Sequence, residues 1–225
     1  MSHPFLARNR QGKKFMVETQ MSDGEMVSPL RNQPVPARSQ STITTLLQSA
    51  AKVVDCVGAD RLTLELVALS AGVSIGTVYR YFADARHLLD AVGRNNLDRF
   101  DTECLQRISP RCNPVWTHAV GSVLDYVENE FRFQAGFRGI RFGDHLDGRS
   151  HPRDQSGLSV AAAKLGTKLA DTYPLIVDCG ILDRVEVAMV LYDAMLSRAF
   201  ALTDCGDTRI IATAHQIALD HLNNG

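Results

Sequence analysis

Apolar residues recur along most of the chain at intervals of three and four positions, which is the spacing of a buried face on an α-helix. The pattern begins near Ser41, and either Ser41 or Thr42 is expected to cap the first helix, which ends at Gly58. The buried face of that helix is predicted to contain Ile43, Leu46, Leu47, Ala50, Ala51, Val54 and Val57. No stretch shows the sustained alternation of a half-buried β-strand. The pattern therefore predicts an all-α protein.

Further helices are predicted wherever a capping residue precedes renewed helical spacing. Thr63, Ser74 and Asp84 each hold this position, and Asn113 followed by Pro114 is typical of another helix start. Later helical patterns cover residues 158–170, 182–202 and 207–222, with Pro174 and Gly206 between them as helix breakers.

The same pattern divides the chain into three parts. Residues 1–40 have little apolar periodicity and several Gly and Pro residues, so we expect a disordered tail. Residues 41–92 are predicted to form a small helical domain, and residues 93–225 a larger helical bundle.

Residues 64–81 have the features of a helix-turn-helix. Ala68 is small enough for two helices to cross closely, and Gly72 permits the positive φ that the turn requires. Ser74 then caps the second helix and points its N-terminus outward. The inward positions are apolar: Val67, Ala71, Val73, Val78 and Tyr81. This combination predicts DNA binding, and the alternative is a helical hairpin that only packs in a core.

The longer run over residues 43–92 resembles the N-terminal domain of TetR-family transcriptional regulators. The resemblance lies in "LTLELVALSAGVSIGTVYRYF", followed by "ADARHLLDAV". It implies a three-helix DNA-binding domain of the helix-turn-helix type, followed by a helical domain for ligand binding and dimerisation. A repressor of this type binds a near-palindromic operator as a homodimer and is released by a small-molecule effector.

The resemblance also implies roles for individual residues, with the second helix of the motif in the major groove of double-stranded DNA. Hydroxyl groups at Thr63, Thr77, Tyr79 and Tyr81 would donate to phosphates and so set the register. Arg80 would pair with guanine. The full DNA-binding set is Thr63, Ser74, Ile75, Gly76, Thr77, Tyr79, Arg80, Tyr81 and Arg86. Ile75 would contact a thymine methyl group and Gly76 would allow close approach, while Tyr79 has the alternative role of packing its helix onto the domain.

One position departs from the family pattern. Family members usually have a phosphate-binding lysine three residues after the phenylalanine, where this chain has Ala85. Either Arg86 replaces that contact from the next position or one phosphate contact is lost. Arg38, just before the first helix, is a second candidate to compensate.

The segment 182–202 is apolar on more than one face, which is typical of a helix buried on several sides. Together with 207–222 it is predicted to form half of a four-helix dimer interface, as it does in the family. The alternative is that both helices complete a monomeric core.

An effector pocket is predicted in the larger domain from its aromatic, Met and Arg residues. The candidates are Trp116, Phe137, Arg138, Arg141, Tyr192 and Met195. The alternative for each of the apolar candidates is an ordinary core position.

Composition and charge add few constraints. The net charge is −1, with +1 over residues 38–100 and −4 over residues 101–225, so the DNA-binding part is only slightly basic. Five scattered cysteines without close pairs indicate reduced thiols, and no apolar run is long enough to span a membrane. Without a recognisable signal peptide, the expected location is the cytoplasm.

Other chemistries find little support in the sequence. His145, Asp147, His151 and Asp154 lie in a polar stretch without metal-ligand spacing, so we expect a solvated loop and no metal. No catalytic motif is present, and neither an enzyme nor a cofactor is expected. The remaining alternatives are an all-α enzyme or binding protein with an incidental helix-turn-helix, and a DNA-binding activator or ligand-free architectural regulator.

Overall fold

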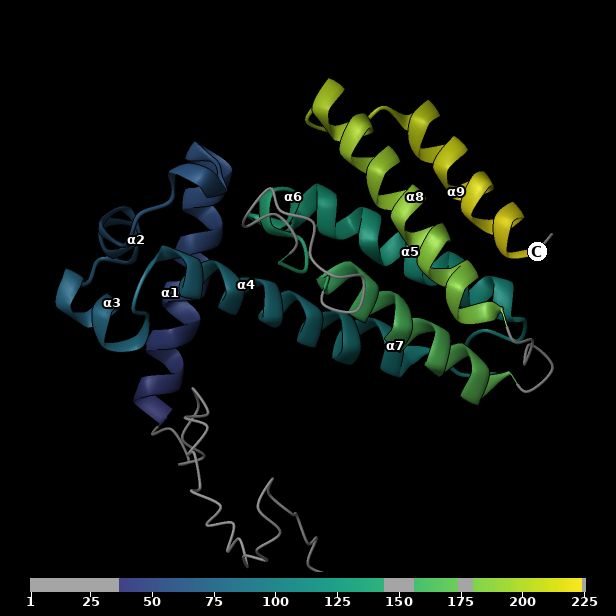
Figure 1. Ribbon diagram of the computed structural model, residues 1–225, viewed down its shortest axis with the longest axis horizontal. Helices are drawn as coiled ribbons and strands as arrows, with labels where there is room; N and C mark the ends of the chain where they lie inside the picture. The colour runs from purple at the N-terminus through teal and green to yellow at the C-terminus, as the bar shows by residue number, and fades with distance from the viewer. Residues whose placement is uncertain (1–36, 144–155, 174–179, 224–225) are drawn as a thin grey trace, which may run out of the picture. The chain divides into compact units, whose positions relative to one another are not determined.

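The computed structural model describes residues 37–143, 156–173 and 180–223 (Figure 1). Every regular element in these ranges is helical, so the predicted all-α class is confirmed. Most of the predicted tail lies outside the described residues, as do His145, Asp147, His151 and Asp154. None of the described helices is long and apolar enough to cross a bilayer.

The N-terminal part contains α1 (Ala37–Val57), α2 (Leu64–Ala71), α3 (Ile75–Tyr81) and α4 (Ala85–Arg99), with a short 3-10 turn at Ala59–Arg61. The predicted caps are confirmed for the last three helices. Thr63 Oγ1 accepts from the Leu66 N–H (3.3 Å), Ser74 Oγ from the Thr77 N–H (3.3 Å) and Asp84 Oδ1 from the His87 N–H (2.8 Å). Local sequence therefore sets these helix starts.

The first helix begins at Ala37, five or six residues earlier than a cap at Ser41 or Thr42 predicts. Ser41 and Thr42 lie inside α1 and do not cap it. The Ser41 carbonyl accepts from the Thr45 hydroxyl (2.9 Å), one helical turn later. Nothing in the segment from Ala37 to Gln40 breaks a helix, so the turn continues upstream past the first apolar position.

The core of the N-terminal part is formed by inward residues of α1 to α4. Leu46, Val67, Val78 and Leu88 are fully buried there. Gly72 has a φ of +67°, and its N–H bonds back to the end of α2, which confirms the predicted turn between α2 and α3.

Beyond α4, the chain makes a π-helical stretch at Phe100–Cys104 and a 3-10 turn at Leu105–Arg107. The helices of the larger part follow: α5 (Trp116–Phe133), α6 (Phe137–Ile140), α7 (Gly157–Thr172), α8 (Ile181–Leu202) and α9 (Thr208–Asn223). Helices α8 and α9 lie side by side (Figure 1). The core of the larger part includes a row of four phenylalanine rings. Phe100 packs against Phe142, Phe142 against Phe137 and Phe137 against Phe131, with 5.5–5.6 Å between ring centroids.

The predicted start of α5 is wrong by two residues, because Val115 and not Asn113 is the N-cap. Asn113 is buried and bonds to distant residues. Its Nδ2 donates to Ser122 Oγ (3.1 Å), and its carbonyl accepts from the Tyr173 hydroxyl (2.5 Å). The amide side chain is therefore oriented by Ser122 of α5, and the backbone carbonyl by Tyr173, and Asn113 does not cap the helix.

Two contacts connect the N-terminal helices to the α6 region. Asp55 of α1 accepts from the Gly136 N–H (2.8 Å), and Gly136 approaches the backbone of Ala51. Asn96 of α4 donates from Nδ2 to the Arg141 carbonyl (2.6 Å). The segment after α5 therefore contacts both α1 and α4.

Candidate nucleic-acid interface

The outer face of α3 carries the residues predicted to meet DNA. Ile75, Gly76, Tyr79 and Arg80 are exposed and occupy one side of the helix, at intervals of one, three and one positions. Val78, on the opposite side, is fully buried and holds the helix to the core. A helix anchored by one face presents the other as a rigid surface for a groove.

Arg80 lies against its neighbour Tyr81. Its Nη2 donates to the Tyr81 hydroxyl (3.0 Å), and the guanidinium lies 4.9 Å from the centre of the Tyr81 ring. Hydrogen bonding to Ser39 and to Arg80 lowers the pKa of Tyr81. Since Arg80 is exposed and bonds to its neighbour in the chain, rotation of the side chain exposes its paired donors without disturbing the core.

The predicted phosphate contacts are arranged around the two helix starts. Ser74 Oγ and Thr77 Oγ1 are 3.0 Å apart, so these hydroxyls bond to each other in the free protein. A hydroxyl that accepts as a cap keeps its hydrogen for donation, and this applies to Thr63, whereas the Ser74 and Thr77 hydroxyls share one hydrogen bond and keep one hydrogen between them for a phosphate. Tyr79 is 53% exposed, which argues against a purely packing role.

The position that departs from the family pattern lies at the first residue of α4. Ala85 is half-buried against the N-terminal core, while Arg86 next to it is exposed. The side chain of Arg38 lies outside the described residues. Among the described side chains, the exposed Arg86 is therefore the candidate for the phosphate contact that the family lysine would make.

Comparisons with known proteins agree with this geometry at both ends of the chain. The family described as "Bacterial regulatory proteins, tetR family" matches residues 46–92, and "Tetracyclin repressor-like, C-terminal domain" matches residues 114–224. A TetR-family transcriptional regulator from Streptomyces coelicolor has a similar structure, with 28% identity and a TM-score of 0.69. The similarity covers 81% of this chain and 98% of that chain.

The chain belongs to the TetR family of transcriptional regulators. Members of this family are DNA-binding regulators and not enzymes, in agreement with the sequence expectation. No curated protein matches the sequence.

Two further solved structures share the fold. One concerns control of antibiotic production by bacterial hormones, with 18% identity, a TM-score of 0.62, and coverage of 83% of this chain and 98% of that chain. The other is the fatty acid degradation regulator FadR from Bacillus halodurans, with 15% identity, a TM-score of 0.51, and coverage of 84% and 97%. At these identities the likeness concerns the fold alone.

The residues predicted to line an effector pocket in this TetR-family chain pack mostly inside the larger domain. Tyr192 and Phe137 are fully buried, and the Tyr192 hydroxyl donates to the Leu124 carbonyl (3.2 Å). Burial raises the pKa of Tyr192. Trp116 and Met195 are half-buried and pack against the same core.

The two arginines predicted to line the effector pocket form hydrogen bonds and an ion pair within the protein. Arg138 donates to the carbonyls of Phe131 (2.7 Å) and Asp204 (2.6 Å). Arg141 is buried, pairs with Asp193 (2.7 Å) and donates to the Arg138 carbonyl (2.7 Å) and to Ser197 Oγ. Arg141 also has a φ of +47°, the one positive φ at a non-glycine residue in the described chain. These donors are committed to structural bonds, because the short turn around α6 exposes carbonyls that need partners.

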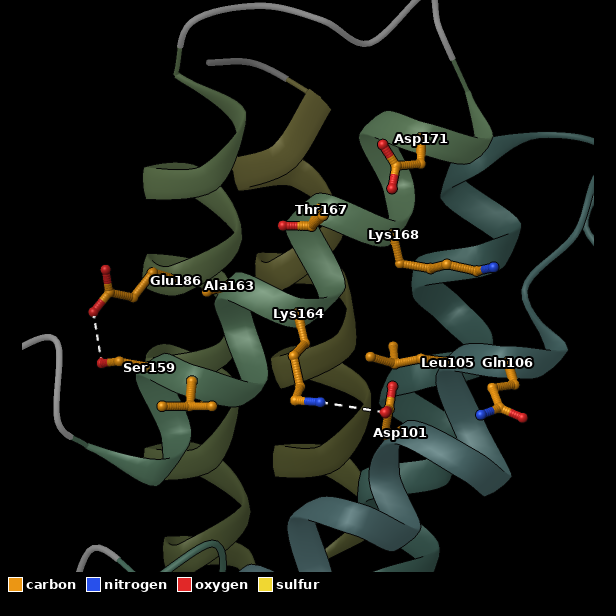
Figure 2. Close-up of a pocket in the computed structure, with 11 residues that line it drawn as sticks. Asp101, Leu105, Gln106, Ser159, Ala163, Lys164, Thr167, Lys168, Asp171 and Glu186 are labelled. Carbon is orange, nitrogen blue, oxygen red and sulfur yellow. Dashed lines mark hydrogen bonds and ion pairs between the residues drawn. The ribbon is translucent and has the colours of Figure 1, made fainter. Parts of the chain in front are cut away.

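A hollow of about 800 Å³ lies elsewhere, between α7 and the segment that follows α4 (Figure 2). None of the six residues predicted to line an effector pocket borders this hollow, and Arg138 borders a different one beside α6, so the effector role of the six stays a prediction. The residues that line the hollow beside α7 are Asp101, Leu105, Gln106, Ser159, Val160, Ala163, Lys164, Thr167, Lys168, Asp171 and Glu186.

Both sides of the hollow carry paired polar groups (Figure 2). Lys164 on α7 forms an ion pair with Asp101 on the segment after α4 (3.2 Å). Ser159 donates to Glu186 of α8 (2.8 Å). The α7 residues alternate charged and small side chains on one face, which resembles an ordinary solvated face in the sequence. The only sequence signal was the presence of Val160 and Ala163 on that face.

Proposed function

We propose that the chain is a transcriptional repressor that binds a near-palindromic operator as a homodimer and is released by a small-molecule effector. The observation that carries the DNA-binding step is the exposed face of α3, with Arg80 and Tyr79 outward and Val78 buried behind them. Such a regulator has to reach DNA, so the expected cytoplasmic location is part of the proposal.

In this proposal Arg80 leaves Tyr81 and pairs with guanine through two hydrogen bonds, while Ile75 contacts a thymine methyl group and Gly76 lets the backbone approach. Thr63, Thr77, Tyr79 and Tyr81 donate to phosphates, and Ser74 holds the helix start toward the backbone of the DNA. Arg86 supplies the phosphate contact that Ala85 cannot make. The phosphate contacts set the register, and Arg80 supplies sequence discrimination.

The test selects preferred operator sequences from a random pool with the wild-type chain and with Arg80→Ala. We expect Arg80→Ala to relax preference at one base pair of each half-site, with a loss of about 1–3 kcal/mol in discrimination there. Arg94→Ala, which removes an exposed arginine further along α4, is the matched control and should keep the preference. An unchanged preference in Arg80→Ala, or equal binding of wild type to every sequence, contradicts the assignment.

Dimerisation is supported by an uncovered apolar face on the last two helices. Val190, Leu191 and Leu202 of α8 and Ile217 of α9 are all at least 40% exposed. A second copy packed on this face with two-fold symmetry would bury them and place two α3 helices on one side of the DNA. We expect Val190→Asp to shift the chain from dimer to monomer in sedimentation equilibrium. Val115→Asp, at a similarly exposed valine before α5, should leave the dimer intact.

The hollow beside α7 is the proposed effector site. Leu105, Val160 and Ala163 offer apolar contact, and the three carboxylates outnumber the two lysines, so the lining does not favour an anion. The ligand class that fits is an uncharged or cationic small molecule with an apolar body and hydrogen-bonding groups.

Release would follow from the position of Asp101 and Leu105, which lie on the π-helical stretch and the 3-10 turn that directly follow α4 in the chain. A ligand that separates Lys164 from Asp101 shifts this segment and with it α4, on which the DNA-binding helices pack. The ligand then favours a state in which both half-sites cannot be engaged together.

The effector step is tested by thermal-shift screening of a small-molecule library with wild type and with Ala163→Trp, which fills the hollow. Compounds that stabilise the wild type but not Ala163→Trp are expected to weaken binding to the selected operator. Compounds that stabilise both proteins equally would place the effector elsewhere, and compounds that bind without changing DNA affinity would contradict release.

A further inference from the structure

Three side chains with metal-binding chemistry meet where α5 packs against α9. Asp125 and Glu128 are three residues apart on α5 and therefore share a face, and His215 projects from α9 toward them. His215 Nε2 lies 3.7 Å from Asp125 Oδ1 and 3.6 Å from Glu128 Oε2. The three ligating atoms all lie within 4.8 Å of one another.

These separations are too long for hydrogen bonds, whose N···O distances are usually about 2.7–3.2 Å. They are close to the spacing of two ligands on one metal ion. Zn–N bonds of about 2.0–2.1 Å and Zn–O bonds of about 2.0–2.2 Å at a tetrahedral angle place the two ligand atoms about 3.4 Å apart. The imidazole and both carboxylates could therefore contact one ion after small side-chain rotations.

A neighbouring arginine orients Glu128. Arg132 donates from Nε (2.8 Å) and Nη2 (2.7 Å) to Glu128 Oε1, and this leaves Oε2 directed at His215. Partners of this kind fix ligand carboxylates in known metal sites. The two carboxylates and the arginine sum to one negative charge, which favours a divalent cation.

The imidazole of His215 is held by packing. Its ring meets the Tyr192 ring edge-on, with centroids 5.1 Å apart and planes at 89°. Tyr192 is itself buried and bonded to the Leu124 carbonyl of α5. His215 therefore has a fixed direction before any ion binds, which reduces the entropy lost on binding.

The group lies away from the proposed dimer face. His215 is two residues from Ile217, and two helical positions correspond to a rotation of about 200° around α9. His215 thus faces α5, whereas Ile217 is exposed on the other side. A second copy on the dimer face would leave the three ligands accessible.

We propose that Asp125, Glu128 and His215 bind one divalent transition-metal ion, with water completing the coordination. Zn²⁺ suits one imidazole and two carboxylates. The ion ties α5 to α9 and stabilises the larger domain by binding the folded state alone. This site goes beyond the proposed function and does not depend on DNA binding.

The experiment titrates Zn²⁺ into the full chain by calorimetry at a pH above 7, where imidazole is mostly neutral. The protein is first stripped with a chelator, and all accessible thiols, which among the described residues are Cys56, Cys112 and Cys205, are alkylated so that they do not bind zinc. We expect one Zn²⁺ per chain, a rise in Tm with Zn²⁺, and weaker binding as the pH falls because protons compete for the ligands.

Three variants test the assignment of ligands. His215→Ala and Glu128→Gln should lose this binding, and Glu128→Gln keeps the size of the side chain and an acceptor for Arg132. Arg132→Gln should weaken binding by about 10–100-fold, as loss of an orienting partner does in other metal sites. His118→Ala, at an exposed histidine on α5, the helix that carries Asp125 and Glu128, should bind Zn²⁺ as tightly as wild type.

Stoichiometric binding that both His215→Ala and Glu128→Gln abolish supports the site. The proposal is overturned if the alkylated wild type binds no Zn²⁺, or if these two variants bind it as tightly as wild type. The second result would mean that Zn²⁺ binds elsewhere on the chain. Circular dichroism of each variant without metal separates loss of a ligand from loss of fold.

Discussion

An arginine on the exposed face of α3 and an arginine in the turn around α6 differ in burial and in the partners they bind. On α3, Arg80 bonds only to the adjacent Tyr81 and remains exposed. Around α6, Arg141 is buried and its donors serve the nearby Arg138 carbonyl and, from α8, the Asp193 carboxylate and the Ser197 hydroxyl. The difference teaches that a polar side chain is available to a ligand when its partners are local and its surroundings are open. Residue type alone does not distinguish the two.

Glycines in the two regions differ in the same way. Gly72 in the turn before α3 has a φ of +67° and open space where a Cβ would lie. Gly136 before α6 has a φ of +72°, but a Cβ there would lie 2.7 Å from Ala51 Cα. The first glycine is required by the backbone conformation, and the second is also required by packing against α1.

The largest effect is expected from Arg141→Ala. The substitution removes the guanidinium that pairs with Asp193 and donates to the Arg138 carbonyl, and breaking a largely buried ion pair of this kind costs about 3–5 kcal/mol of the free energy of unfolding. Arg141→Gly should be less harmful than Arg141→Ala by about 1–2 kcal/mol, because glycine accepts the positive φ. Urea unfolding at a fixed protein concentration measures both, with the exposed Arg111→Ala as control. A loss below about 1 kcal/mol in Arg141→Ala would show that the pair contributes little.

Gly136→Ala is expected to destabilise more than Gly72→Ala. Both substitutions place alanine at positive φ, which costs about 1–2 kcal/mol. Only Gly136→Ala adds a clash with backbone, which raises its cost by a further 1–3 kcal/mol, roughly the range for overpacked sites. Urea unfolding of the two variants side by side gives the difference, and equal losses would mean that α1 moves away at little cost.

Ser74→Ala should cost about 1 kcal/mol of stability, since it removes the cap of α3. It should also weaken operator binding, because the start of α3 is less well ordered. Ser70→Ala, at an exposed serine of α2, is the matched control for both urea unfolding and a gel-shift assay. Normal stability in Ser74→Ala would indicate that the bond between Ser74 and Thr77 contributes little.

The smallest effect concerns the departure at Ala85. Ala85→Lys adds the missing cation at the start of α4, so the slope of the logarithm of DNA affinity against the logarithm of salt concentration should steepen by about one. Asn223→Lys adds the same charge at the end of α9 and should not change the slope. If Ala85→Lys has no effect while Arg86→Ala lowers the slope, Arg86 already occupies the phosphate site.

Much of the DNA-binding part was predictable because its determinants are local. The caps at Thr63, Ser74 and Asp84 and the turn at Gly72 each depend on residues within three or four positions. The segments that became α7, α8 and α9 were also predicted closely, since apolar spacing defines their buried faces. The lining of the hollow beside α7 was not predictable in this way. An aromatic stripe has the same pattern whether it lines a cavity or fills a core, and Tyr192 and Phe137 fill the core.

The amino-acid sequence by itself determined the all-α class, the helix-turn-helix and the membership of its family, because these follow from periodicity and short-range hydrogen bonds. Tertiary structure decided which polar groups are available. Asn113 does not cap α5 but bonds to Ser122 on α5 and to Tyr173 after α7, and the buried Arg141 pairs with Asp193. His215 was brought to Asp125 and Glu128 from far along the chain. The physical reason is that such contacts depend on how helices pack against one another, and the spacing of residues within one helix does not contain that information.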